Sequence, residues 1–192
     1  MKLWLLRHAE VLLPPGLCYG ASDVAADAAH TREAARAAAT QLPAKLPVRV
    51  SGLGRAQQLA RELHALRPDL GPATVDQRLN EMDFGCWELQ RWDAIPRAAM
   101  DAWTANFDAH RFGGKESVAM LLSRVADALA DVRRALDADG EALWITHAGV
   151  IRSIQHIATR GPVPVGEAAR WPRTEAPTGG LQAVAFAAGS PG

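Results

Sequence analysis

The sequence predicts an α/β fold built on a mostly parallel sheet, and two observations support that prediction. First, short apolar runs of strand length alternate with longer stretches whose apolar residues recur at helical spacing. Second, two of these runs are near echoes, since LWLLRHA (3–9) and LWITHAG (143–149) each contain a histidine followed by small residues. A chain of 192 residues has the length of a single domain, taken here as 1–192.

The first part of the chain predicts three strands and two helices. Residues 2–7 are an apolar run of strand length, and 28–42 are rich in alanine, the residue with the highest helix propensity. Residues 47–51 (PVRVS) form a short β-branched strand. Residues 54–66 carry apolar side chains at helical spacing, and a proline two positions later ends the helix. A third strand is expected over 73–76.

The second part continues the alternation after an insert. Residues 88–116 hold large aromatic residues among polar ones and predict short helices that form a lid. An amphipathic helix is expected over 117–136. The remaining expected elements are a buried strand, a helix, a loop with four prolines and four glycines, an edge strand and a fraying end, at 141–146, 150–158, 161–180, 181–186 and 188–192.

Composition and charge exclude several classes of protein. The formal net charge is zero, so no basic field favours a nucleic-acid or membrane partner. Two cysteines are too few for a disulfide framework, and no apolar stretch approaches the length of a membrane span. We therefore expect a soluble cytoplasmic protein with neither kind of partner. The edge strand leaves a homodimer open, because an unpaired edge can accept a second copy.

Histidine and arginine side chains gather at one predicted edge of the sheet. Ligands of open α/β sheets bind beyond the carboxyl ends of the strands, where His8 and His147 each follow a strand. Arg7 precedes His8, and Arg55 lies in a first helical turn, where the helix dipole favours an anion. A single histidine in such a position is more often an ordinary loop residue, and a single arginine is more often exposed to solvent. Together they favour a phosphate pocket, because arginine grips phosphate with paired hydrogen bonds.

One stretch imitates a dinucleotide-binding motif. VRVSGLGRAQQLA has the strand, Gly-x-Gly and helix of that fingerprint. Gln57 occupies the third small position, however, and its side chain would block close packing of helix on strand. We therefore reject a dinucleotide-binding dehydrogenase.

A dense acidic and aromatic stretch, LNEMDFGCWE, supplies candidates for a general acid. Its carboxylates are Glu81, Asp83 and Glu88, and Phe84 and Trp87 accompany them. Aromatic pairs around a turn usually reflect local packing. A carboxyl group beside apolar rings also suits proton transfer to a leaving group.

Four ordered motifs, LLRHAE, SGLGRAQQLA, LNEMDFGCWE and WITHAGVIR, resemble those of the histidine phosphatase superfamily, whose best-known branch is the phosphoglycerate mutases. The resemblance spans 2–152 and implies a three-layer αβα fold with a small helical lid. LNEMDFGCWE, together with MKLWLLRH and FGGKES, is closest to the α-ribazole phosphatases of cobalamin assembly. The expected activity is hydrolysis of a small-molecule phosphate ester, without a cofactor or metal ion.

The resemblance also implies a role for each residue of the pocket. His8 would be the nucleophile that takes up the phosphoryl group. Arg7 and Arg55 would neutralise its oxygens, and His147 would donate a hydrogen bond to it. Glu81 would protonate the leaving oxygen and then activate water.

Some departures and alternatives remain. Ala9 stands where the family usually has glycine, so the backbone there must not need a positive φ. An asparagine often found after the first motif is absent from EVLLPPG.

The alternatives to hydrolysis are mutase-type phosphoryl transfer and a non-catalytic member that only binds phosphorylated ligands. Trp92, Trp103 and Phe107 in the lid would either stack on a planar base of the substrate or pack against one another.

Overall fold

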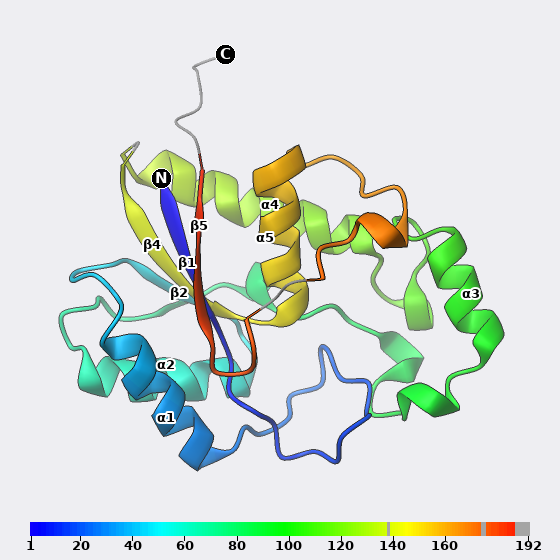
Figure 1. The fold of residues 1–192 in the computed structure, drawn as a ribbon, viewed down its shortest axis with the longest axis horizontal. Coiled ribbons are helices and arrows are strands. Elements are labelled where there is room, and N and C mark those ends of the chain that lie inside the picture. Colours follow the sequence, from blue (N-terminus) through cyan, green and yellow to red (C-terminus); the bar gives the residue numbers. More distant parts are fainter. Residues whose placement is uncertain (138, 174–175, 187–192) are drawn as a thin grey trace.

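The computed structural model describes residues 1–137, 139–173 and 176–186, and it contains a five-stranded sheet of order β3-β2-β4-β1-β5 (Figure 1). The pairs β1–β4, β2–β4 and β2–β3 are parallel, and β5 runs antiparallel to β1 at one edge. The predicted mostly parallel sheet is therefore confirmed. Its strands are β1 (Lys2–Arg7), β2 (Val48–Val50), β3 (Thr74–Val75), β4 (Glu141–Thr146) and β5 (Leu181–Ala185).

Helices cover both faces of the sheet and make the three layers that were predicted. In Figure 1, α1 and α2 lie on one side of the strands and α4 and α5 on the other, whereas α3 stands apart. The α-helices in the described part of the chain are α1 (Ala28–Ala39), α2 (Gly54–Leu66), α3 (Arg97–Ala105), α4 (Val118–Ala135) and α5 (Ala148–Arg160).

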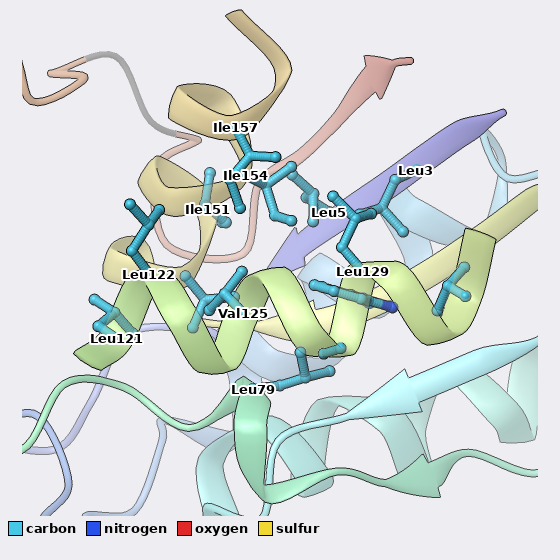
Figure 2. Packing of buried hydrophobic residues seen from close by; sticks show 14 of the residues in the cluster. Leu3, Leu5, Leu79, Leu121, Leu122, Val125, Leu129, Ile151, Ile154 and Ile157 are labelled. Atoms are coloured by element: carbon cyan, nitrogen blue, oxygen red, sulfur yellow. The ribbon is translucent and has the colours of Figure 1, made fainter. Parts of the chain in front are cut away.

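Two hydrophobic cores lie on opposite faces of the sheet because side chains alternate along each strand. Leu3 and Leu5 of β1 pack with α4 and α5, whereas Leu6 packs with α1 and α2. Figure 2 shows the first of these cores, in which the apolar stripe of α4 faces β1 and α5. That stripe includes Leu121, Leu122, Val125 and Leu129.

The segment 88–116, which is predicted to form a lid, contributes to a small apolar cluster separate from the two main cores. Its short helices are η3 (Trp92–Ala94), α3 and η4 (Phe112–Gly114), preceded by η2 (Gly85–Trp87). No residue of α3 is fully buried, and Trp103 of this helix packs against the edge of the first main core. Phe112 is completely buried at the centre of the cluster and stacks on Trp103, with ring centroids 4.4 Å apart. The prediction of short helices here is confirmed.

Element boundaries differ from the predictions at a few places. The third strand is only two residues long, and both of its residues are exposed at the edge of the sheet. The α5 helix begins at Ala148, two residues before the predicted start at 150, so Gly149 lies within its first turn. The predicted loop 161–180 includes a single turn, η5 (Ala168–Arg170). The expected fraying end, 188–192, lies outside the described residues.

Within the described residues, no helix combines the length and the apolar character needed to cross a bilayer. The homodimer stays a prediction; β5 does lie at an edge of the sheet, as that prediction requires.

Candidate active site

His8 follows β1 directly and is almost fully buried, with 2% of its surface exposed. Its Nδ1 lies 2.7 Å from the carbonyl oxygen of Ala9. A carbonyl oxygen only accepts, so Nδ1 carries the proton and Nε2 keeps a lone pair. Burial, followed by the positive charge of Arg55, lowers the pKa of His8 to about 3, although the Ala9 hydrogen bond acts in the opposite direction. His8 is therefore neutral, as a nucleophile must be.

Residue 9 is compatible with this geometry although it is not glycine. Ala9 is fully buried, and it is not among the residues of positive φ. The backbone of His8 is fixed on both sides, because its N–H donates to the carbonyl of Thr146 and its carbonyl accepts from Gly179. The expectation that position 9 needs no positive φ is confirmed.

His147 meets His8 because of the strand register. β1 and β4 pair from Lys2 with Glu141 to Arg7 with Thr146, so each histidine follows the last paired residue of its strand. The two imidazole centroids lie 5.0 Å apart. Two histidines 139 positions apart are thus brought together at the carboxyl edge of the sheet, as the echoing runs predicted.

Hydrogen bonds around Ser51 fix the proton on His147. Asn80 Oδ1 accepts from the Gly52 N–H at 2.7 Å and from the Ser51 hydroxyl at 2.8 Å. Because that hydroxyl has already donated its proton, it can only accept from His147 Nε2, which lies 2.7 Å away. Nε2 of His147 therefore carries the proton.

The other ring nitrogen of His147 has a different character. Nδ1 is buried with no hydrogen-bond partner among the described residues. Burial, followed by the nearby His8 and Arg55, lowers the pKa of His147 well below its usual value. The ring is therefore neutral without a ligand, and Nδ1 is unprotonated and carries a lone pair. Donation from Nδ1 to a phosphoryl oxygen requires a second proton, which a nearby dianion favours.

Arg55 is a buried cation without a carboxylate partner among the described residues. Only 1% of its surface is exposed, and its guanidinium donates to the carbonyls of Ser22 and Gly20, both at 2.7 Å. None of the ion pairs in the described part of the chain involves Arg55. Burial lowers its pKa. The charges of Glu81, Asp23 and Glu88 act on it from beyond ion-pair distance. A buried guanidinium whose direct hydrogen-bond partners are carbonyl groups is the arrangement expected for an anion-binding site.

Glu88 builds the loop that holds Arg55. Its carboxylate accepts from the backbone N–H groups of Gly20, Ala21, Ser22 and Phe84 and from the Ser22 hydroxyl, at 2.6–3.2 Å. Burial alone would raise the pKa of Glu88, but these hydrogen bonds outweigh it and lower the pKa. Glu88 therefore positions the 20–22 loop, a role that no pattern in the sequence indicates.

Glu81 lies against the first turn of α5. Both of its carboxylate oxygens accept from the N–H of Gly149, at 3.1 and 2.9 Å, and Oε1 also accepts from Met82 N. A Cβ atom at position 149 would lie 2.2 Å from Glu81 Oε1, so only glycine allows this approach. Since Gly149 is two residues from His147, Glu81 is held next to the histidine pair.

A partly buried ion pair fixes the segment that carries Glu81. Arg124 on α4 pairs with Glu116 at 2.7 Å. The same guanidinium donates to the carbonyls of Arg78, Asn80 and Glu81. Arg124 thus positions both Glu81 and the Asn80 amide that orients Ser51.

Arg7 and Tyr19 complete the surroundings of His8 and Arg55. Arg7 ends β1, and its Nη1 donates to the carbonyl of Ala176 at 3.1 Å. The ring centroid of Tyr19 lies 6.5 Å from that of His8 and 5.4 Å from Cζ of Arg55. Sequence analysis missed Tyr19, because nothing in the CYGAS stretch indicates that it lies beside the two histidines.

The site therefore gathers the buried side chains of His8, Arg55 and His147, with Arg7 and Glu81 close enough to act on them electrostatically. Its positive charge comes from the guanidinium groups. Across the residues that the structure describes, no group of three or more His, Cys, Asp or Glu side chains is arranged to hold a metal ion. Chemically, a neutral imidazole nucleophile beside two arginines suits attack on phosphorus.

Comparisons with known proteins also relate the chain to proteins that act on phosphate groups. A family model described as the histidine phosphatase superfamily (branch 1) matches residues 3–189. The structure of TTHB049 from Thermus thermophilus is 27% identical, covers 96% of this chain and 93% of that one, and superimposes with a TM-score of 0.70. A phosphoglycerate mutase from the same organism is also 27% identical, with coverage of 96% and 92% and a TM-score of 0.70.

A mycobacterial glucosyl-3-phosphoglycerate phosphatase has the same fold, with 24% identity, coverage of 87% and 86% and a TM-score of 0.70. A search of curated proteins finds no match. These comparisons confirm the predicted phosphoglycerate mutase-like fold.

Proposed function

The chain belongs to branch 1 of the histidine phosphatase superfamily, and on that premise we propose that it hydrolyses phosphate monoesters through a phosphohistidine on His8. The observation that supports this most directly is the buried Arg55, which lacks a carboxylate partner among the described residues and lies beside a neutral His8. An anion is needed there, and a phosphoryl group beside an imidazole lone pair is poised for transfer.

The first chemical step transfers the phosphoryl group to the protein. The Nε2 lone pair of His8 attacks phosphorus while the bond between phosphorus and the ester oxygen breaks. Glu81 gives its proton to the departing oxygen, which leaves as a neutral alcohol. Arg7 and Arg55 balance the charge on the phosphoryl oxygens, and the carbonyl of Ala9 retains the proton on Nδ1.

The second step regenerates the enzyme. Water attacks phosphorus and loses a proton to the Glu81 carboxylate, and the nitrogen–phosphorus bond breaks to return neutral His8. Inorganic phosphate is released. His147 supports both steps by donating from Nδ1 to a phosphoryl oxygen once the bound dianion has favoured its protonation, while Nε2 stays bound to Ser51.

For the natural substrate we propose α-ribazole 5′-phosphate, an intermediate of cobalamin assembly. The support is the resemblance of LNEMDFGCWE, MKLWLLRH and FGGKES to the motifs of α-ribazole phosphatases. Hydrolysis is favoured over mutase-type transfer because the 88–116 insert is short and aromatic, whereas a mutase needs extra basic residues for a carboxylated substrate. A cytoplasmic location belongs to the same proposal, since Cys18 and Cys86 are free thiols.

The decisive experiment combines a substrate panel with trapping of the phosphoenzyme. The purified protein is incubated with α-ribazole 5′-phosphate, 3-phosphoglycerate and nitrophenyl phosphate, and released phosphate is measured. We expect phosphate release, and an acid-labile, base-stable phosphoenzyme that His8→Ala abolishes. His64→Ala, on the exposed side of α2, is the matched control and should keep full activity.

Each of the other results contradicts one part of the proposal. Conversion of 3-phosphoglycerate to 2-phosphoglycerate without phosphate release would replace hydrolysis by mutase activity. Phosphate binding without turnover of any ester would indicate a non-catalytic binding protein. A tenth or more of wild-type activity in His8→Ala would rule out His8 as the nucleophile.

A further inference from the structure

Tyr19 is a polar side chain of the site to which neither proposed step gives a role. It is half-buried, and it is the single tyrosine of the chain. Its ring lies edge to face against His8, with the centroids 6.5 Å apart and the planes at 65°, and its centroid lies 5.4 Å from Cζ of Arg55. The proposed nucleophile and the buried guanidinium therefore share this aromatic neighbour.

The backbone of Tyr19 is anchored through both of its neighbours. The N–H of Cys18 donates to the carbonyl of Gln90 at 2.7 Å. The carbonyl of Gly20 accepts from Arg55 Nη2, also at 2.7 Å. A Cβ atom at position 20 would lie 1.9 Å from a backbone carbonyl oxygen, so the chain is tightly packed there. The fold itself therefore holds Tyr19 in place, as required of a group that acts on a transition state without rearranging.

The hydroxyl of Tyr19 is accessible and not bound to protein groups. Within the described part of the chain it makes no hydrogen bond. Arg55 Nε and His147 Nδ1 are buried atoms without a partner among the described residues, whereas the Tyr19 oxygen retains accessible surface. A ligand in the site can therefore reach this hydroxyl.

The charged groups of the site act on the Tyr19 oxygen. Burial raises the pKa of Tyr19; beyond burial, Arg7 and Arg55 lower the pKa and Glu81 and Glu10 raise it, and the pKa stays above its ordinary value. The oxygen is the atom that titrates, so it lies within electrostatic reach of both the proposed phosphate clamp and the proposed acid. Because the phenol keeps its proton at neutral pH, it is an uncharged hydrogen-bond donor.

We propose that Tyr19 is a further catalytic residue, whose hydroxyl donates a hydrogen bond to an equatorial oxygen of the phosphoryl group as that group moves to and from His8. This inference rests on the proposed function. His8 bonds to phosphorus and Arg55 balances the charge of the oxygens, so a side chain beside both is next to the group being transferred. In-line transfer puts the leaving oxygen on the side of phosphorus opposite His8, which leaves the equatorial oxygens for a neighbour of His8.

The first test removes the hydroxyl and keeps the ring. Tyr19→Phe should lower kcat/KM roughly 10- to 100-fold, the usual cost of losing a hydrogen bond to a charged acceptor. The loss should be equal for ethyl phosphate and nitrophenyl phosphate, because both carry the same phosphoryl group. Thr40→Val is the matched control: the Thr40 hydroxyl is exposed at the end of α1 and donates to the Ala37 carbonyl, so its removal should leave kcat/KM unchanged.

The second test uses the fact that Tyr19 is the single tyrosine of the chain. Production of the protein with 3-fluorotyrosine places one fluorine atom in it, beside the hydroxyl. Titration with inorganic phosphate should move the one fluorine NMR resonance, with the dissociation constant that calorimetry gives for the same labelled protein. A chloride titration at equal ionic strength should leave the resonance in place. Tyr19→Phe should bind phosphate about tenfold more weakly.

The outcomes separate this inference from the proposed function. Equal kcat/KM of Tyr19→Phe and wild type on both esters would overturn the inference and leave the phosphatase intact. A loss confined to ethyl phosphate would also overturn it, because the hydroxyl would then serve the leaving oxygen, which nitrophenolate does not need to have protonated. Hydrolysis of no ester by the wild-type protein would contradict the phosphatase, and the fluorine resonance then decides alone: a resonance that phosphate moves supports Tyr19 as a phosphate ligand, and an unmoved one refutes it.

Discussion

Burial of His8 in its neutral form should make the protein lose stability in acid. The unfolded imidazole has its ordinary pKa of 6.5, whereas the folded one has a pKa of about 3. Below pH 6.5 the unfolded state therefore binds a proton at His8 that the folded state does not bind, and the free energy of unfolding falls as the pH falls. The stability is fully present above pH 6.5 and is lost progressively down to about pH 3.

The expected size of the effect follows from the two pKa values. At about pH 4.5, two pH units below the unfolded pKa, protonation of His8 in the unfolded state should lower the free energy of unfolding by about 3 kcal/mol relative to neutral pH. Solvent screens little of this cost, because the side chain is nearly inaccessible. His8→Gln removes the titrating group, since glutamine is neutral at both pH values and can still donate to the Ala9 carbonyl.

The assay is urea unfolding followed by circular dichroism at about pH 7.5 and 4.5. The drop in unfolding free energy between the two pH values should be smaller in His8→Gln than in the wild type by about 3 kcal/mol. His147 shifts in the same direction but is present in both proteins. His64→Gln, an exposed position, should behave as the wild type. Equal drops in His8→Gln and wild type would refute the burial argument.

Four further outcomes are expected. Glu81→Gln should give a burst of nitrophenolate near one per site followed by slow turnover, while alkyl esters are slow from the first step; equal loss on both, without a burst, would make Glu81 structural. Nitrophenyl phosphate hydrolysis should survive excess EDTA, because the charge clamp consists of guanidinium groups; activity lost and then restored by a divalent ion would contradict this. Ser51→Ala should lower kcat/KM roughly 10- to 100-fold by freeing His147, and an unchanged value would exclude that positioning role. Glu88→Gln should lower the free energy of unfolding by about 1–3 kcal/mol together with phosphate affinity, and an unaltered affinity would separate Glu88 from Arg55.

The residues that the sequence could identify are those fixed by local pattern. Arg7, His8 and His147 follow apolar strands, and the edge of a parallel sheet brings such positions together whatever their separation. Arg55 was found because a strand, a turn and a helix start occur in order around it. Glu81 required the family resemblance, since three carboxylates in LNEMDFGCWE were equivalent on chemistry alone.

The residues that the sequence could not identify act through long-range hydrogen bonds. Glu88 reaches the 20–22 loop, and Arg124 reaches three carbonyls that lie 43 to 46 positions away. Neither contact leaves a periodicity or a spacing in the chain. The same holds for Ser51, whose importance depends on the direction in which the Asn80 amide points.

If the protein is the phosphatase proposed above, the buried guanidinium of Arg55 limits how the site can distinguish substrate from product. Its charge is balanced by whichever phosphoryl group arrives, and free phosphate carries the same oxygens as the ester. The site therefore cannot reject its own product by electrostatics, and inorganic phosphate should inhibit competitively. Discrimination must come from the organic part of the substrate. The rate of hydrolysis would then depend on the ratio of ester to inorganic phosphate.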